Sequence, residues 1–221
     1  RIISFKLKPF ESLSEVSIAE ELGVSRTPTR EALVRLVDLG LVEVFPQRGT
    51  FVTPLRMPDL AQSQFLRESL EIGLLRRAFE RGEFKALVSG LRAEIAIKRT
   101  CADLGEMEQF YDSDERFHRR IAEAAGMPNI AAEIDRVKVH MDRFRHLMIT
   151  GIEDIGSVLL QHVSITDAIE AGDLPAVEAA MQAHLRRIMQ YADKAMDAFQ
   201  HYLESTRAPV SGMKRRAAVT S

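Results

Sequence analysis

From residue 58 to about residue 205, apolar side chains recur at the spacing of an α-helix, with charged residues between them and no convincing strand. This pattern predicts that residues 58–207 form a bundle of about six or seven helices. The expected breaks contain Gly, Pro or charged polar residues and lie near residues 81–84, 103–106, 124–129, 150–156 and 171–175. The fold class is therefore predicted to be mainly α.

Residues 1–55 follow a different pattern, with two short helices and then a hairpin. Ser and Glu residues suited to a helix start precede an apolar stripe that ends at Gly23, and a second helix is expected with Ser25 or Thr27 as its N-cap. Two short runs of β-branched and aromatic residues follow, separated by a Pro-Gln-Arg-Gly turn. The order helix, tight turn, helix and hairpin predicts a winged helix-turn-helix domain.

The first turn of the second helix is polar and basic. In a winged helix-turn-helix, this end of the helix faces the major groove of DNA, where Arg can bond guanine and Thr can contact a phosphate or a thymine methyl. The candidate DNA contacts are Arg26, Thr27, Thr29 and Arg30, with Arg48 at the hairpin tip. The alternative is that the arginines lie on a solvated helix face.

Total charge does not explain an affinity for DNA. The net charge of the chain is −2, and residues 1–55 carry seven basic and seven acidic residues, so the position of each charge has to supply the binding site. The single cysteine, Cys101, excludes an internal disulfide and a thiolate metal site. With no apolar run of the length that a bilayer requires, we expect a cytoplasmic protein, and the small, polar and basic tail at 208–221 is predicted to be disordered.

The stretch LSEVSIAEELGVSRTPTREALVRLVDLGLVEVFPQRGTFV, residues 13–52, resembles the DNA-binding domain of the GntR family of bacterial transcription regulators. The family has a similar Ser-Arg-Thr-Pro-x-Arg-Glu-Ala-Leu run and an Arg-Gly wing tip. The resemblance implies that Ser25 and Gly49 also lie at the DNA. One departure is Phe10, where the family usually has Gly, so we expect a different turn after the first helix of the family. Because the chain begins late in that helix, we expect further residues before Arg1.

Three histidines and one aspartate in the second part have the pattern of a metal site. Asp114 and His118 are four residues apart and share a helix face, while His162 and His184 lie in two later apolar helices. If these side chains converge, they would bind a divalent ion such as Zn²⁺, Ni²⁺ or Mn²⁺ and leave positions open for a ligand. The alternative is that the histidines are ordinary core or surface residues.

The second part is also similar to the effector domain, of FCD type, of the FadR subgroup. Many members carry an Asp-x-x-x-His pair, a later His and a final His-Leu, and these match Asp114, His118, His162 and His184. The resemblance implies a metal ion at the floor of a cavity that binds a small carboxylate. Arg67, in an Arg-x-x-Leu-Glu pattern, would be a partner for that carboxylate; its alternative is an ion pair with Glu68 or Glu71.

The other histidines and two further arginines remain unassigned. His140, His146 and His201 match no ligand position and are expected to be structural or exposed. Arg143 and Arg145 could both line the cavity, and the spacing does not decide between them.

These features together predict a homodimeric transcription regulator that responds to an effector and is not an enzyme. A two-fold dimer reads both halves of a palindromic operator. Repression relieved by the effector is the commoner pattern in the family. The alternatives are a regulator that senses the metal itself and a metal-dependent hydrolase, in which the ion would activate water.

Overall fold

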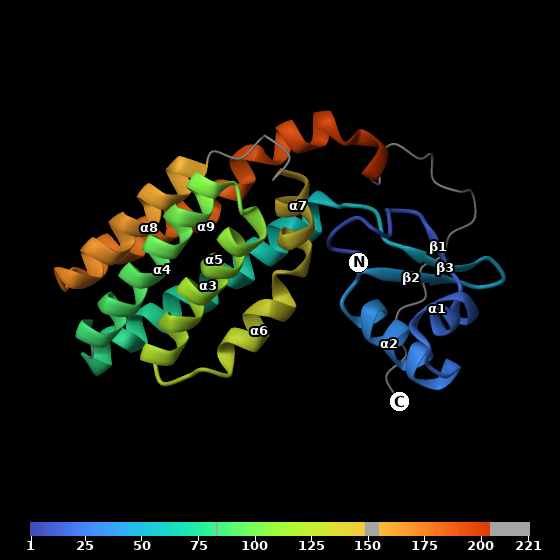
Figure 1. Ribbon diagram of the computed structural model, residues 1–221, viewed down its shortest axis with the longest axis horizontal. Helices are drawn as coiled ribbons and strands as arrows, with labels where there is room; N and C mark the ends of the chain where they lie inside the picture. The colour runs from blue at the N-terminus through green and yellow to red at the C-terminus, as the bar shows by residue number, and fades with distance from the viewer. Residues whose placement is uncertain (83, 149–154, 204–221) are drawn as a thin grey trace.

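The computed structural model describes residues 1–82, 84–148 and 155–203. Figure 1 shows a bundle of long helices joined to a smaller unit of two helices and a sheet, which confirms the predicted fold class. The predicted tail at 208–221 and the expected break near 150–154 lie outside the described residues. No described helix has the length and apolar content needed to cross a membrane.

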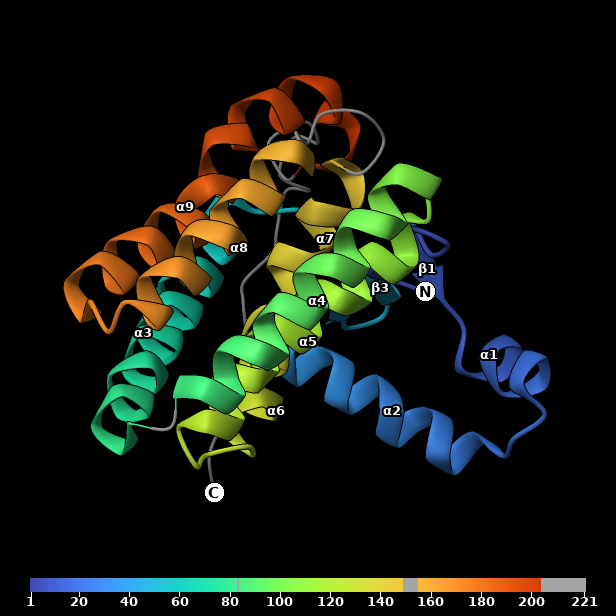
Figure 2. The same cartoon turned by 60° about the vertical axis from the view of Figure 1, so that its left-hand side comes forward.

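The two N-terminal helices are α1 (Glu15–Leu22) and α2 (Arg26–Asp38). Ser14 caps α1 because its hydroxyl accepts a hydrogen bond from the Ser17 N–H at 3.2 Å, and Gly23 ends the helix with φ at 65°. Ser25 occupies the N-cap position of α2 in extended conformation, and Thr27 lies inside the helix. Figure 2 shows α1 and the start of α2 on the side of the molecule away from the bundle.

The wing is a three-stranded antiparallel sheet in the order β1, β3, β2. The predicted hairpin is formed by β2 (Val42–Phe45) and β3 (Gly49–Val52), with Val42 opposite Val52 and Phe45 opposite Gly49. The sequence did not indicate β1 (Ser12–Leu13), because a strand of two residues has no recognisable periodicity.

The turn before β1 contains Phe10, the residue at which the sequence departs from the family pattern. Residues 2–5 form a turn and not a helix. Phe10 has φ at 69°, a conformation that glycine adopts without steric cost. The chain therefore keeps a left-handed residue at the position where the family usually has Gly.

Seven helices form the described part of the bundle, followed by a short 3₁₀-helix. Their bounds are Met57–Arg81 (α3), Phe84–Leu104 (α4), Met107–Ala124 (α5), Ile130–Val137 (α6), Val139–Met148 (α7), Ile155–Glu170 (α8), Leu174–Ala198 (α9) and Gln200–Tyr202 (η1). The main core lies between α3, α4, α5, α8 and α9, which supply most of its buried aliphatic side chains. The break at Lys138, between α6 and α7, was not predicted because no Gly or Pro marks it.

Helix α7 lies between the bundle and the small unit (Figure 1). On one side, Met141, Phe144 and Leu147 join a cluster with Leu55 and Leu60. On the other, Val139 packs into the core of the N-terminal unit. The same short helix is thus part of both hydrophobic clusters.

Candidate functional site

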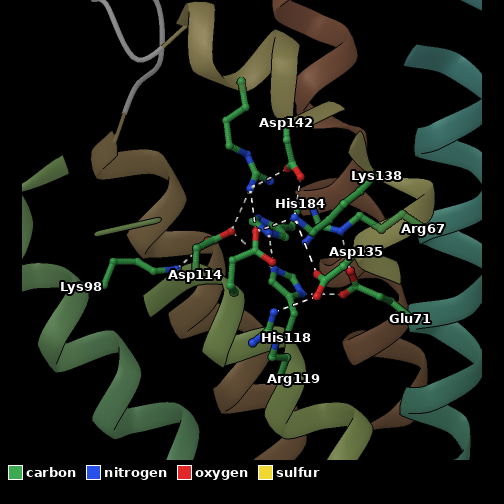
Figure 3. A network of polar contacts seen from close by, with 12 residues as sticks. Arg67, Glu71, Lys98, Asp114, His118, Arg119, Asp135, Lys138, Asp142 and His184 are labelled. Carbon is green, nitrogen blue, oxygen red and sulfur yellow. Dashed lines mark hydrogen bonds and ion pairs between the residues drawn. The ribbon is translucent and has the colours of Figure 1, made fainter. Parts of the chain in front are cut away.

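The structure brings the four predicted metal ligands together in the bundle. Asp114 and His118 come from α5, His162 from α8 and His184 from α9, and all four are buried. Each offers one ligand atom, and these atoms all lie within 4.8 Å of one another. Figure 3 shows Asp114, His118 and His184 converging on one point.

The spacing of the imidazole nitrogens fits a small ion. The Nε2 atom of His184 lies 3.2 Å from Nε2 of His162 and 3.3 Å from Nε2 of His118. Asp114 Oδ1 lies 3.5 Å from His162 Nε2. Ligands bound to a tetrahedral ion at about 2.05 Å are about 3.3 Å apart. The residues therefore fit a divalent ion of the size of Zn²⁺.

Two neighbouring side chains fix the ring protons of His118 and His184. The Glu71 carboxylate lies 2.5 Å from Nδ1 of His118, and the Gln161 amide oxygen lies 3.1 Å from Nδ1 of His184. Both oxygens are acceptors, so both Nδ1 atoms donate and both Nε2 atoms carry lone pairs. Two lone pairs that face each other at 3.3 Å repel each other, and a cation bound between them removes this repulsion.

Lys98 is a further charged group at the site. Its Nζ lies 2.7 Å from Asp114 Oδ1 and 2.5 Å from His162 Nδ1. Sequence reasoning missed Lys98 and Gln161, and named Glu71 only as a possible partner of Arg67. For Lys98 a signal existed, since it continues the apolar stripe of α4 after Leu91 and Ile95.

Burial and neighbouring charges set the protonation of the ligands. Burial alone would raise the pKa of Asp114, but Lys98 and then Arg145 hold it well below its usual range. Burial, with neighbouring histidines as the next cause, holds the pKa values of His162 and His184 well below theirs. A charged carboxylate and neutral imidazoles are the forms that bind a metal ion. Burial lowers the pKa of Lys98, and Asp114 opposes that shift.

Arg67 lies beside this cluster, forms one of the two ion pairs that the sequence offered as its alternative role, and also lines a cavity. Its Nε donates to Glu71 at 2.6 Å, and both side chains are 2% exposed. Arg67 also lines a cavity of about 30 Å³ next to Asp114 and His184. Arg145 and Arg187 line the same cavity, so its wall carries three guanidinium groups.

Arg143 and Arg145 point in different directions. The Nη1 of Arg145 lies 3.5 Å from Asp114 Oδ2, at the cavity. Arg143, 0% exposed, donates to the backbone oxygen of Thr53 at 2.7 Å and to the Thr53 hydroxyl oxygen at 3.1 Å. The Thr53 hydroxyl in turn donates to the Gly40 oxygen at 2.8 Å. Arg143 therefore contacts the N-terminal unit and not the cavity.

None of the remaining histidines joins the metal ligands. His140 donates from Nε2 to the Leu39 oxygen, 3.1 Å away at the end of α2. The His146 ring stacks on Phe5 at 6.1 Å between centroids, and His201 is exposed. Their placement agrees with structural or exposed roles.

The basic residues of α2 lie on the surface. The side chains of Arg26 and Arg30 are 65% and 68% exposed. Both donate to the Glu15 carboxylate, Arg26 at 3.2 Å and Arg30 at 3.0 and 3.2 Å. The hydrogen bond from Arg30 lowers the pKa of Glu15, a partner that sequence reasoning missed.

The other candidate DNA contacts divide into two groups. Exposed positions are Ser25, Thr27, Arg48 and Gly49. Thr29 does not fit the expectation, because it is 4% exposed and its hydroxyl donates to the Ser25 oxygen at 3.1 Å. Thr29 therefore faces the interior of the protein and not the surface of α2.

Comparisons with known proteins agree with this architecture. Residues 1–52 match the family described as bacterial regulatory proteins, gntR family, and residues 63–187 match the FCD domain. An uncharacterized HTH-type transcriptional regulator in an unstable DNA locus of Streptomyces ambofaciens is 36% identical over 187 residues, which cover 85% of this chain and 78% of that protein.

Two Escherichia coli proteins are also similar. The HTH-type transcriptional repressor RspR is 30% identical over 193 residues, which cover 86% of this chain and 82% of RspR. The structure of McbR/YncC matches with a TM-score of 0.71 and 23% identity, and covers 90% of this chain and 92% of that one. At this identity the structural match supports the fold alone.

Proposed function

The chain belongs to the FadR subgroup of the GntR family of bacterial transcription regulators, with an FCD domain after the DNA-binding domain, and we propose that a small carboxylate bound beside a divalent metal ion controls its affinity for operator DNA. The observation that carries the metal is the pair of imidazole lone pairs that face each other at 3.3 Å, each fixed by an acceptor on the opposite ring nitrogen. A cation bound by both Nε2 atoms would remove the repulsion between their lone pairs. When bound, the ion supplies a positive centre with an open position for an anion.

The charges of the cavity support an anionic effector. Arg67, Arg145 and Arg187 line it together with the metal ligands Asp114 and His184. A guanidinium group binds a carboxylate through two parallel hydrogen bonds, which favours a carboxylic acid over a neutral sugar or an amine. The relatives and both matched families are regulators, so we assign this site to binding and not to catalysis.

The size of the cavity implies that an effector moves its walls. Its volume of about 30 Å³ is close to that of a single water molecule, whereas sites for small molecules usually have about 300 Å³ or more. Two residues of the wall, Met141 and Arg145, belong to α7. A carboxylate that enters here has to displace side chains of the wall, and we propose that those of α7 are among them.

Helix α7 also provides the connection to the DNA-binding domain. His140 donates to the last turn of α2, and Arg143 donates to Thr53, just after β3. A shift of α7 would move the recognition helix and the wing relative to the bundle. An effector can change DNA affinity in this way only if it binds one position of α7 better than the other.

For the DNA itself, we propose that Ser25, Arg26, Thr27, Arg30, Arg48 and Gly49 form the interface. The exposure of both arginines and their place in the first turn of α2 support this assignment. One recognition helix covers half of an operator, so we further propose a homodimer. The name of RspR as a repressor supports repression, with the effector releasing the DNA.

Elemental analysis of the purified protein tests the metal part of this proposal. We expect about one divalent ion per chain, as for a single site of this ligand number. His118→Ala and His184→Ala should lose it, while His201→Ala, at an exposed histidine away from the cluster, should retain it. No ion in the parent protein, either as purified or after addition of Zn²⁺, would refute the metal site.

A screen of small carboxylic acids by thermal shift then tests the effector. An acid that binds the folded protein raises its unfolding temperature. We expect the hit to weaken binding to operator DNA in the presence of the metal. If Zn²⁺ alone changes DNA affinity and no acid does, the protein is a regulator that senses the metal.

A further inference from the structure

Lys98 is buried beside the metal ligands in a place that a core hydrophobe would normally occupy. It is 0% exposed and follows Leu91 and Ile95 along the buried face of α4. Its Nζ lies over the rings of Phe110 and Phe117, 5.4 and 5.6 Å from their centroids, and its hydrogen bonds within the described residues go to two predicted metal ligands, Asp114 and His162. The side chain is thus directed at the metal site.

The hydrogen bonds around the three imidazoles are not equivalent. His118 and His184 each have an oxygen acceptor at Nδ1, which leaves Nε2 with a lone pair for the ion. At His162 the partner of Nδ1 is the Lys98 ammonium, which has three donors and no acceptor. His162 therefore accepts at Nδ1 and carries its proton on Nε2, the atom that would have to bind the ion.

The positive charges beside Asp114 also weaken the binding of a metal ion. Asp114 is the one carboxylate among the four ligands, and Lys98 already neutralises it at 2.7 Å. Arg145 adds a second cation 3.5 Å from the other carboxylate oxygen. A divalent ion would share this carboxylate with both and would be repelled by both.

We propose that Lys98 weakens and thereby sets the metal affinity of this site, because its ammonium occupies Asp114 and holds His162 in the ring form that cannot bind an ion at Nε2. The ion and the ammonium compete for the same two side chains, so Zn²⁺ binds as Lys98 leaves them. The inference rests on the metal site of the proposed function and adds a residue that makes the bound ion exchangeable.

Two substitutions of Lys98 test this inference, with Zn²⁺ as the probe. Lys98→Met removes the charge and keeps an apolar chain of similar length. Lys98→Gln removes the charge and also offers His162 an acceptor, because the amide oxygen can accept from His162 Nδ1 and leave Nε2 with a lone pair. Its amide N–H can still donate to Asp114. Lys138→Met is the matched control, because Lys138 is 6% exposed and pairs with Glu115 and Asp142, which are not ligands.

The Zn²⁺ dissociation constant is measured on the metal-free full chain by competition with a coloured chelator, after circular dichroism has shown that each variant is folded. We expect both Lys98 variants to bind Zn²⁺ about 10- to 100-fold more tightly than the parent, the range over which residues that contact metal ligands change affinity. Lys138→Met should match the parent.

The results separate this inference from the metal site itself. Zn²⁺ bound by the parent with equal or higher affinity than by both variants would overturn the role of Lys98 and leave the metal site in place. Zn²⁺ bound by the variants but not by the parent would support the role of Lys98 and would refute a bound ion in the parent protein. No binding by any of these proteins would overturn both.

Discussion

The ion pair between Arg67 and Glu71 gives a quantitative test of the site in the metal-free protein. Both side chains are 2% exposed, Arg67 Nε donates to Glu71 at 2.6 Å, and the other Glu71 oxygen accepts from His118. Glu71→Gln keeps the volume and removes the charge. The buried guanidinium of Arg67 then loses its anion, a change that costs about 3 to 5 kcal/mol at other buried pairs.

The lowered pKa of Glu71 gives a similar value for the stabilisation that its charge provides. Burial would raise this pKa, but Arg67 and then His118 lower it from 4.5 to about 2. This difference corresponds to about 3 kcal/mol, at about 1.4 kcal/mol for each tenfold change in acidity. Because the folded-state pKa is lowered, this stabilisation is complete above pH 4.5 and is lost as the pH falls toward about 2.

Urea unfolding followed by circular dichroism, with a chelator present, measures the effect. We expect Glu71→Gln to lower the free energy of unfolding by about 3 kcal/mol at neutral pH, and the difference from the parent to shrink below pH 4.5. Glu178→Gln is the control, since its pair with Arg76 is at the surface and contributes less than about 1 kcal/mol. Equal losses in the two variants, or a difference that does not depend on pH, would refute this account of Glu71.

Three further changes test the DNA interface, the connection through α7 and the cavity. Arg30→Ala should weaken binding to an operator fragment by about 1 to 3 kcal/mol in fluorescence anisotropy if a base contact is lost, whereas Arg35→Ala, at the other end of α2, should have a smaller effect. Thr53→Val removes the hydroxyl that accepts from Arg143 Nη1 and donates to the Gly40 oxygen, and keeps the bond from Arg143 Nη2 to the Thr53 backbone oxygen, so it should destabilise the protein by about 1 to 3 kcal/mol in thermal unfolding and reduce the response of DNA affinity to the effector. Arg145→Met should abolish the thermal shift caused by a carboxylate and retain Zn²⁺; loss of the ion would show that Arg145 serves the metal ligands instead.

The architecture was predictable because each major element has its own local signal. Ser14 and Gly23 delimit α1, and a Pro-Gln-Arg-Gly turn marks the hairpin. The boundary between α6 and α7 has no such signal, since Lys138 ends α6 in ordinary right-handed conformation, with φ at −89°. For the same reason the sequence left open whether the bundle has six or seven helices.

At the site, the ligands were easier to predict than the residues that support them. Asp114 and His118 stand out because four-residue spacing places them on one face of a helix. Glu71 and Gln161 contact the ligands across helices, and no spacing along the chain encodes such contacts. Thr29 was misplaced because the sequence shows that a residue is in the first turn but not that it faces the core.

The three largest fully buried side chains among the described residues are all cations: Arg67, Arg143 and Lys98. A core that only had to be stable would contain leucine or methionine at these positions, because burying an ion pair seldom stabilises more than packing apolar groups does. Lys98 contacts predicted metal ligands, Arg67 lines the cavity, and Arg143 donates a hydrogen bond to the DNA-binding domain at Thr53. Each of these three cations donates to a small number of acceptors, so a metal ion or an anion that binds nearby would change its hydrogen bonds. We infer that the stability lost at these positions serves the proposed response of the bundle to a metal ion and an anion.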